Sequence, residues 1–191
     1  MPFFSFKKDE TPFFISAERI FSPEECKKII DIGMKLKPQE AGLANTKKVD
    51  KKIRKSKTSW IYPHQDYSWI FNTIAQKVMY INDNSFKFDI YGLGENLQFT
   101  VYEAPGGHYH QHTDKLYGYA IRRLSFSILL NDPNEFKGAD LLLYDCEIGK
   151  PMTKSQGGMI MFPSYVVHKV SPITKGIRYS LVGWITGANI R

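Results

Sequence analysis

Residues 158–187, GMIMFPSYVVHKVSPITKGIRYSLVGWITG, contain three short segments in which β-branched, aromatic and polar side chains alternate, with Gly, Pro and Ser between them. Alternation with a period of two, bounded by turn residues, predicts β-strands. The same pattern reaches back to residue 86, so about eight short strands are expected over roughly 105 residues. Strands of this number and length favour a jelly roll or barrel.

Two helices are expected before the strands. Residues 22–25, SPEE, match a capping box with Pro at the first helical position, and the apolar face that follows extends to about Leu36. Residues 66–82 repeat apolar side chains at helical spacing. We expect both helices to pack on one sheet of a mainly β protein with supporting α. The predicted organisation is one domain over 1–191, with helical support and a basic loop in 1–85 and the jelly-roll core in 86–187.

Composition narrows the class of protein. The chain has 191 residues, of which 42% are hydrophobic, and no apolar run reaches the length of about 18 residues that a membrane-spanning helix needs. The first residues, MPFFSFKKDE, do not follow the order of a secretory signal. Cys26 and Cys146 stand alone, which argues against a disulfide framework and a cysteine-based zinc site. These features predict an intracellular, cytoplasmic protein with no membrane partner.

Positive charge is concentrated in one segment. Residues 47–57, KKVDKKIRKSK, hold seven basic residues and one acidic residue, while the chain as a whole carries a formal charge of +7. A solvated loop is the simplest interpretation of such a segment. Nucleic-acid contact needs more aromatic residues than the nearby Trp60 and Tyr62 supply, and is not expected. The third hypothesis, which we favour for residues 44–58, is a loop that closes over an acidic or peptide-like substrate.

The most informative residues are the histidines of GHYHQHTD, residues 107–114. If the strand ran through, His108, His110, His112 and Asp114 would share one face. A polar edge-strand face or a hydrogen-bonded cluster would also explain the alternation. His112 and Asp114, however, form an HxD pair, and His168 lies in a later strand that a jelly roll can place beside it. Two histidines and one carboxylate are the usual ligands of non-haem Fe(II) in oxygenases.

Arg178 follows His168 by ten residues, in GIRYSLVGWI. A buried arginine near a metal pocket needs an anionic partner. A dicarboxylate cosubstrate would provide one, bound by the guanidinium in bidentate fashion with the Ser180 hydroxyl as a further donor. The alternative is a surface arginine paired with an acidic side chain.

With these motifs in place, residues 54–187 resemble the Fe(II)- and 2-oxoglutarate-dependent oxygenases, in particular the prolyl 4-hydroxylase-like (PKHD-type) family. The resemblance rests on RKSKTSWI at 54–61, LQFTVYEAPGGHYHQHTD at 97–114, LSFSILLND at 124–132, GADLLLY at 138–144 and the segment 158–187. It implies a double-stranded β-helix, which is a jelly-roll variant. It further implies iron bound by His112, Asp114 and His168, with 2-oxoglutarate and O₂ as cosubstrates and ascorbate as an accessory cofactor.

The resemblance also implies roles for further residues. Arg178 and Tyr102 would hold 2-oxoglutarate, and Arg122 and Trp184 would contact substrate. The nucleobase-demethylating relatives carry a second arginine where this chain has Trp184, which argues against a nucleic-acid substrate. The implied reaction is hydroxylation of a C–H bond, with succinate and CO₂ as coproducts, and the favoured substrate is a prolyl residue in a peptide or protein.

Three other functions stay open at the level of sequence. The same scaffold could hydroxylate a free amino acid or another small molecule. A metal-dependent isomerase or hydrolase of jelly-roll type would recruit His108 or His110 as an additional ligand. A non-catalytic cupin-like metal-binding module would keep the three ligands without turnover.

Overall fold

The computed structural model describes residues 11–43, 49–115 and 121–188. An eight-stranded sheet, here called the major sheet, runs in the order β1-β12-β8-β15-β6-β4-β2, with β5 paired to β15. All its pairings are antiparallel. Its strands are β1 (Ile15–Ala17), β2 (Gln39–Glu40), β4 (Lys57–Ile61), β5 (Ile90–Leu93), β6 (Leu97–Glu103), β8 (Arg122–Leu129), β12 (Met159–Pro163) and β15 (Ile177–Gly187).

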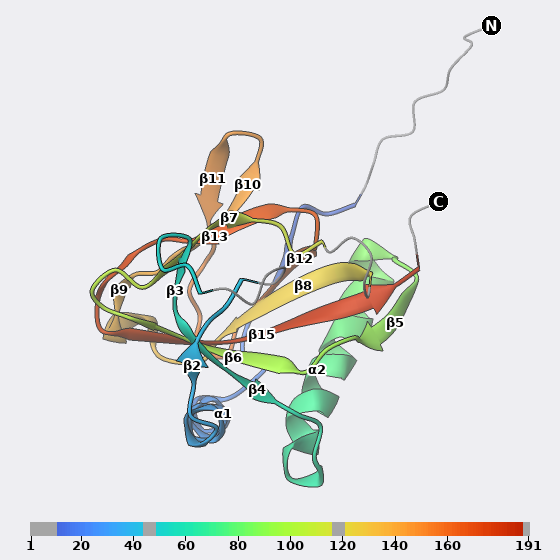
Figure 1. Ribbon diagram of the computed structural model, residues 1–191. Coiled ribbons are helices and arrows are strands. Elements are labelled where there is room, and N and C mark those ends of the chain that lie inside the picture. Colours follow the sequence, from blue (N-terminus) through green and yellow to red (C-terminus); the bar gives the residue numbers. More distant parts are fainter. Residues whose placement is uncertain (1–10, 44–48, 116–120, 189–191) are drawn as a thin grey trace, which may run out of the picture.

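A five-stranded sheet, the minor sheet, faces the major sheet and forms the second layer of the jelly roll (Figure 1). Its order is β11-β10-β13-β7-β3, and a two-stranded sheet pairs β14 with β9. These strands are β3 (Arg54–Lys55), β7 (His108–His112), β9 (Lys137–Gly138), β10 (Leu141–Asp145), β11 (Ile148–Pro151), β13 (Val167–Val170) and β14 (Ile173–Lys175).

The two predicted helices are present as α1 (Pro23–Lys35) and α2 (Ser68–Ile81). Ser22 and Glu25 form the expected capping box at the start of α1. Short helices η1 (Gln65–Tyr67) and η3 (Pro133–Glu135) and a π-helical turn, η2 (Asn82–Phe86), complete the helical structure of the described residues. Both long helices cover the outer face of the major sheet (Figure 1).

Two hydrophobic clusters follow from this arrangement. The first joins the buried side chains of α1 and α2, such as Ile29 and Ile74, to the outer face of the major sheet, which presents Phe99 and Phe126. The second lies between the sheets and includes Leu129, Leu143 and Phe162. The major sheet is therefore buried on both faces, and its inner face looks into the space that holds the polar residues described below. The mainly β jelly-roll class is confirmed.

Two local expectations need correction. The strand predicted from residue 86 begins only at Ile90, because the helix continues through η2 and ends where Lys87 takes a positive φ of 55°. The basic segment is not wholly loop, since Arg54–Lys55 and Lys57–Ile61 are strands. Part of the predicted covering loop, residues 44–48, lies outside the described residues, as do residues 1–10 of the phenylalanine-rich start. The boundaries of the single predicted domain stay a prediction.

Candidate metal and cosubstrate site

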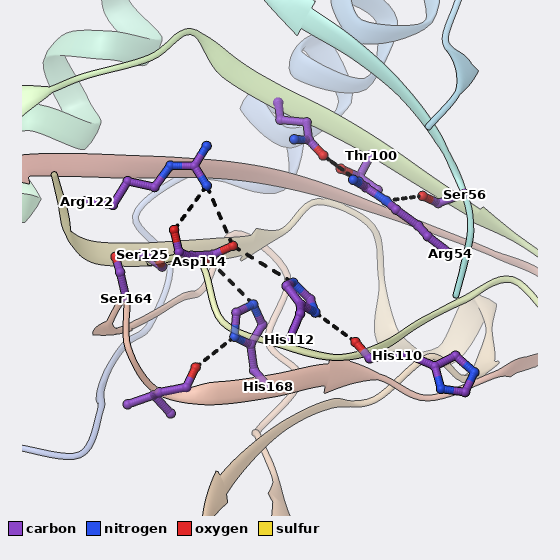
Figure 2. Close-up of polar contacts among 12 residues, drawn as sticks. Arg54, Ser56, Thr100, His110, His112, Asp114, Arg122, Ser125, Ser164 and His168 are labelled. Atoms are coloured by element: carbon purple, nitrogen blue, oxygen red, sulfur yellow. Dashed lines mark hydrogen bonds and ion pairs between the residues drawn. The ribbon is translucent and has the colours of Figure 1, made fainter. Parts of the chain in front are cut away.

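The three residues expected to bind metal come together from two neighbouring strands. His112 ends β7, Asp114 follows two residues later, and His168 lies on β13 directly opposite His112 in the strand pairing. One ligand atom from each lies within 4.8 Å of the others, and all three residues are buried or half-buried. The imidazole Nε2 atoms of His112 and His168 lie 3.9 and 3.5 Å from the two carboxylate oxygens of Asp114 (Figure 2).

Backbone carbonyls fix the orientation of both imidazole rings. Nδ1 of His112 lies 2.8 Å from the carbonyl oxygen of His110, and Nδ1 of His168 lies 3.0 Å from that of Val166. A carbonyl oxygen only accepts, so each Nδ1 carries the proton and donates it. Each Nε2 is then left with its lone pair directed toward Asp114, which is the tautomer that a metal ligand requires.

Electrostatics keeps the ligands in the protonation states that bind a cation. Burial, followed by the neighbouring His168, lowers the pKa of His112 to about 3. Burial alone would raise the pKa of Asp114, but the neighbouring His168 and His112 hold it below its ordinary value. His112 therefore offers a neutral nitrogen and Asp114 an ionised carboxylate at neutral pH. Two imidazoles and one carboxylate fit Fe(II) and leave positions for other ligands.

His108 and His110 do not share the face of His112, as an uninterrupted strand would require. The β7–β13 pairing contains an irregularity between His168 and Val170, where Tyr109 replaces His110 in the register. The Tyr109 ring consequently stacks on His112 with centroids 3.6 Å apart, while His110 points away from the ligands (Figure 2). His108 bonds instead to the backbone carbonyls of Gly106 and Lys52. Neither residue joins the metal ligands.

Arg178 is buried between the sheets, where its Nη1 donates to Ser180 Oγ at 3.2 Å and its guanidinium lies 5.5 Å from the centre of the Tyr102 ring. The three expected cosubstrate residues are thus brought together. Burial lowers the pKa of Arg178, opposed by Tyr102 and Asp140. Arg178 also lines a pocket, and no carboxylate of the described residues forms an ion pair with it. The pocket walls include Ser127, Leu129, Leu141 and Ile160.

The two expected substrate residues lie on the other side of Asp114. The Arg122 guanidinium stacks over the Trp184 ring at 4.0 Å. It donates through Nε and Nη2 to the two Glu95 oxygens, at 2.5 and 2.6 Å, and its Nη1 donates to the Asp114 carbonyl at 3.3 Å. Trp184 Nε1 is buried without a hydrogen-bond partner among the described residues. The half-exposed ring of Trp60 lies 6.1 Å from that of Trp184.

Sequence reasoning missed three residues at this site. Glu95, the partner of Arg122, precedes β6 in a turn with no motif of its own. Tyr109 stands between two histidines and faces the ligands only because the strand pairing is irregular. Arg54 belongs to the basic segment, which composition assigns to solvent, yet only 8% of it is exposed. The signal for Arg54 was its place two residues before Ser56, in the short strand β3 that precedes β4, the strand of Trp60.

Comparison with known proteins agrees with this geometry. Residues 97–186 match the family model of the 2OG-Fe(II) oxygenase superfamily. A PKHD-type hydroxylase of Synechococcus elongatus is 34% identical over 95 residues, which are 47% of this chain and 42% of that protein. A PKHD-type hydroxylase of Idiomarina loihiensis is 32% identical over 81 residues, or 42% of this chain and 37% of that protein. The alignments thus span about two fifths of the curated relatives.

Solved structures show the same fold at low sequence identity. A prolyl-4-hydroxylase from Pseudomonas putida is 18% identical, with a TM-score of 0.74 over 93% of this chain and 94% of its own. A prolyl hydroxylase from Trichoplax adhaerens, solved with a hypoxia-inducible-factor peptide, is 17% identical, with a TM-score of 0.76 over 92% of this chain and 84% of its own.

Two histidines and one aspartate held by a jelly roll are the arrangement that non-haem iron oxygenases use to bind Fe(II). Residues 97–186, which contain His112, Asp114, His168 and Arg178, are similar to the 2OG-Fe(II) oxygenase superfamily. The family brings with it Fe(II) as cofactor and 2-oxoglutarate and O₂ as cosubstrates. None of the helices in residues 11–43, 49–115 and 121–188 is long and apolar enough to cross a membrane.

Proposed function

We propose that this protein is a Fe(II)- and 2-oxoglutarate-dependent dioxygenase that hydroxylates a C–H bond of a prolyl residue in a peptide or protein. One observation carries the proposal: the His112, Asp114 and His168 ligand atoms meet at the minor sheet, and the facing major sheet carries a buried arginine, Arg178, that has no ion-pair partner among the described residues. A module that only binds metal would not need this additional buried charge. The PKHD-type hydroxylases among the relatives support the same class of reaction.

In this proposal His112, Asp114 and His168 hold the metal. Bound Fe(II), together with 2-oxoglutarate and O₂, supplies the oxidising chemistry, in which one oxygen atom enters succinate, the other becomes the substrate hydroxyl, and CO₂ leaves. Arg178 binds the distal carboxylate of 2-oxoglutarate and Ser180 adds a hydroxyl donor. Burial raises the pKa of Tyr102, so its phenol stays protonated and can donate as well. The apolar cluster between the sheets excludes water.

The substrate side of the site is aromatic. Trp184 presents a buried N–H without a partner and a ring that borders the half-exposed ring of Trp60. Such rings suit the flat apolar face of a prolyl residue, and the N–H suits a backbone carbonyl. All three guanidinium nitrogens of Arg122 already donate hydrogen bonds, to Glu95 and to the Asp114 carbonyl. The proposed contribution of Arg122 is therefore to hold Trp184 and the Asp114 backbone in place beside the substrate.

The test is anaerobic reconstitution with Fe(II) and 2-oxoglutarate, followed by O₂ and a panel of proline-containing peptides. Succinate release and peptide mass are measured together. A gain of one oxygen on proline that is lost in His112→Ala, reduced in Arg178→Ala and retained in His110→Ala would support the proposal. Succinate without a modified peptide would retain the oxygenase and reject prolyl peptides. Absence of both in a folded, metal-loaded chain would reject the proposal.

A further inference from the structure

Arg54 is a second buried arginine beside the metal ligands. It lies on β3 at the edge of the minor sheet, and its side chain reaches across to the major sheet, where Nη2 donates to Gln98 Oε1 at 2.6 Å (Figure 2). Nε donates to Ser56 Oγ at 2.9 Å. The guanidinium lies 4.5 Å from the centre of the Tyr109 ring, whose other neighbour is the His112 imidazole. Arg54, Tyr109 and His112 therefore form one stack.

This guanidinium has only neutral partners. No carboxylate of the described residues lies within ion-pair distance of Arg54, and its two hydrogen bonds go to an amide and a hydroxyl. Removing a cation from water costs several kcal/mol unless an anion compensates it. Gln98 Oε1 also accepts from Thr100 Oγ1 at 3.3 Å, so these neutral groups are arranged to hold the arginine in place. Such an arrangement indicates a binding group rather than a structural ion pair.

The remaining guanidinium nitrogen of Arg54, Nη1, is available to a ligand. It makes no hydrogen bond to the described part of the chain. Among the described residues, Trp184 Nε1 is the only fully buried side-chain nitrogen or oxygen that lacks a hydrogen-bond partner. Nη1 of Arg54 also lacks a partner, so it is not fully buried and keeps some contact with solvent. An anion can therefore bond to Nη1 without displacing Ser56 or Gln98.

When Fe(II) and 2-oxoglutarate are bound, the positive charge of Arg54 is not balanced by a neighbouring anion. Glu95 neutralises Arg122. The two carboxylates of 2-oxoglutarate and that of Asp114 balance Fe(II) and Arg178. A metal-bound His112 imidazole is neutral. With metal and cosubstrate bound, Arg54 is the cation near the ligands that still lacks a counter-charge among the described residues.

We infer that Arg54 binds a carboxylate of the substrate, so that the substrate is anionic close to the carbon that is hydroxylated. The inference rests on the proposed function and narrows its substrate class. The carboxylate could be an acidic side chain next to the target residue in a peptide, or the α-carboxylate of a free or C-terminal amino acid. Both present the same chemistry to a guanidinium.

The test measures binding rather than turnover. The chain is loaded with Mn(II) and 2-oxoglutarate in the absence of O₂, and probes are titrated by calorimetry. Acetyl-Pro-Asp-amide is compared with acetyl-Pro-Asn-amide for the side-chain source, and acetyl-proline with acetyl-prolinamide for the α-carboxylate. A charge-assisted hydrogen bond predicts that the acid of at least one pair binds about tenfold more tightly than its amide. Whichever pair shows the preference identifies the source.

Variants assign the preference to Arg54. In Arg54→Gln the acid and amide should differ by less than about twofold, and Arg54→Lys should restore part of the difference because it keeps the charge. Lys55→Gln, which removes an exposed charge from the same strand, should retain the full preference. Thermal unfolding and Mn(II) affinity show whether each variant is folded.

Three results would overturn the inference. The first is equal affinity for acid and amide in both pairs, including failure of every acid to bind at up to about 10 mM. The second is a preference that survives Arg54→Gln. The third is a loss of 2-oxoglutarate affinity in Arg54→Gln as large as that in Arg178→Gln, which would make Arg54 a cosubstrate residue. Failure of the proposed oxygenase activity itself looks different, because the wild-type chain would then not bind 2-oxoglutarate at all.

Discussion

At the scale of single residues, the pair formed by Arg122 and Glu95 controls the surroundings of Asp114. Arg122 Nη1 lies 4.0 Å from Asp114 Oδ1 and is kept from a closer approach by the bidentate contact with Glu95. Without Glu95 the guanidinium would compete with a metal ion for the carboxylate.

We therefore expect Glu95→Gln to lower stability by roughly 2 kcal/mol, since a charged hydrogen bond to a buried arginine is lost. The same change should weaken Mn(II) binding by about tenfold, as loss of an outer contact to a ligand does elsewhere. Urea unfolding and Mn(II) titration measure the two effects. Glu103→Gln is the control, because it removes an exposed carboxylate from the Lys57 pair and should cost less than about 1 kcal/mol. Equal effects in both variants would contradict the prediction.

The two cysteines differ in reactivity because their local surroundings differ. Cys26 is fully buried in α1, and burial followed by Glu25 and Glu24 raises the pKa of its thiol to about 12, whereas Cys146 is exposed. Because the thiolate is the reactive form, iodoacetamide at pH 8 should label Cys146 at once and Cys26 only when the chain unfolds. Mass spectrometry of wild type and Cys146→Ser reads this out.

The raised pKa of the Cys26 thiol also makes the stability of the folded chain depend on pH. The folded chain keeps a proton on Cys26 that the unfolded chain releases above pH 9, so the contribution of this group is intact below pH 9 and falls as the pH rises toward 12. The slope cannot exceed about 1.4 kcal/mol for each pH unit. Cys26→Ala should remove that part of the alkaline loss. An alkaline profile identical to wild type would show that the thiol is already free to ionise in the folded chain.

At the scale of elements, backbone hydrogen bonds at Gly157 connect the segment before α1 to the major sheet. Its carbonyl accepts from the backbone N–H groups of Ile20 and Phe21, just before α1, and its own N–H donates to Leu129 of β8. The residue has φ = 72°, and a Cβ here would overlap the Phe21 carbonyl oxygen.

Gly157→Ala should consequently cost about 3 kcal/mol, from backbone strain and from overpacking together. Gly106→Ala separates the two causes. Gly106 has a similar φ of 82°, but a Cβ there would meet only the end of the Lys55 side chain at 3.8 Å, so strain alone should cost about 1 kcal/mol. Chemical denaturation compares them, and equal losses would rule out the overlap with Phe21.

The elements also show what sequence can and cannot predict. Apolar periodicity and the capping box place α1, α2 and most strands correctly because they record local preferences. The HxD pair and the later histidine were predicted as a unit because their chemistry restricts the alternatives. The directions of His108, His110 and Tyr109 were not predictable, since they depend on how β7 pairs with a strand nearly sixty residues away. The burial of Arg54 depends likewise on its contact with Gln98, 44 positions later.

At the scale of the whole molecule, the metal site links two distant parts of the chain. His112 and Asp114 follow from β7, while His168 comes from β13, and both strands belong to the minor sheet, which faces the major sheet across the pocket of Arg178. An ion held by all three residues binds the folded chain and has no comparable site in the unfolded one. Metal binding should therefore add directly to the stability of the fold.

At a Mn(II) concentration of about 100 times the dissociation constant, the expected gain is about 2.7 kcal/mol. For a chain of this length that raises the midpoint of thermal unfolding by roughly 5–10 °C. Calorimetric scans with and without Mn(II) measure the shift. His168→Ala should abolish it while leaving the apo midpoint within a few degrees of wild type, and His110→Ala should retain it because His110 points away from the ligands. Addition of a chelator should return the wild-type midpoint to its apo value. A shift that persists in His168→Ala would mean that the ion binds elsewhere on the protein, and a shift lost in His110→Ala would mean that the irregular pairing of β7 changes when metal is bound.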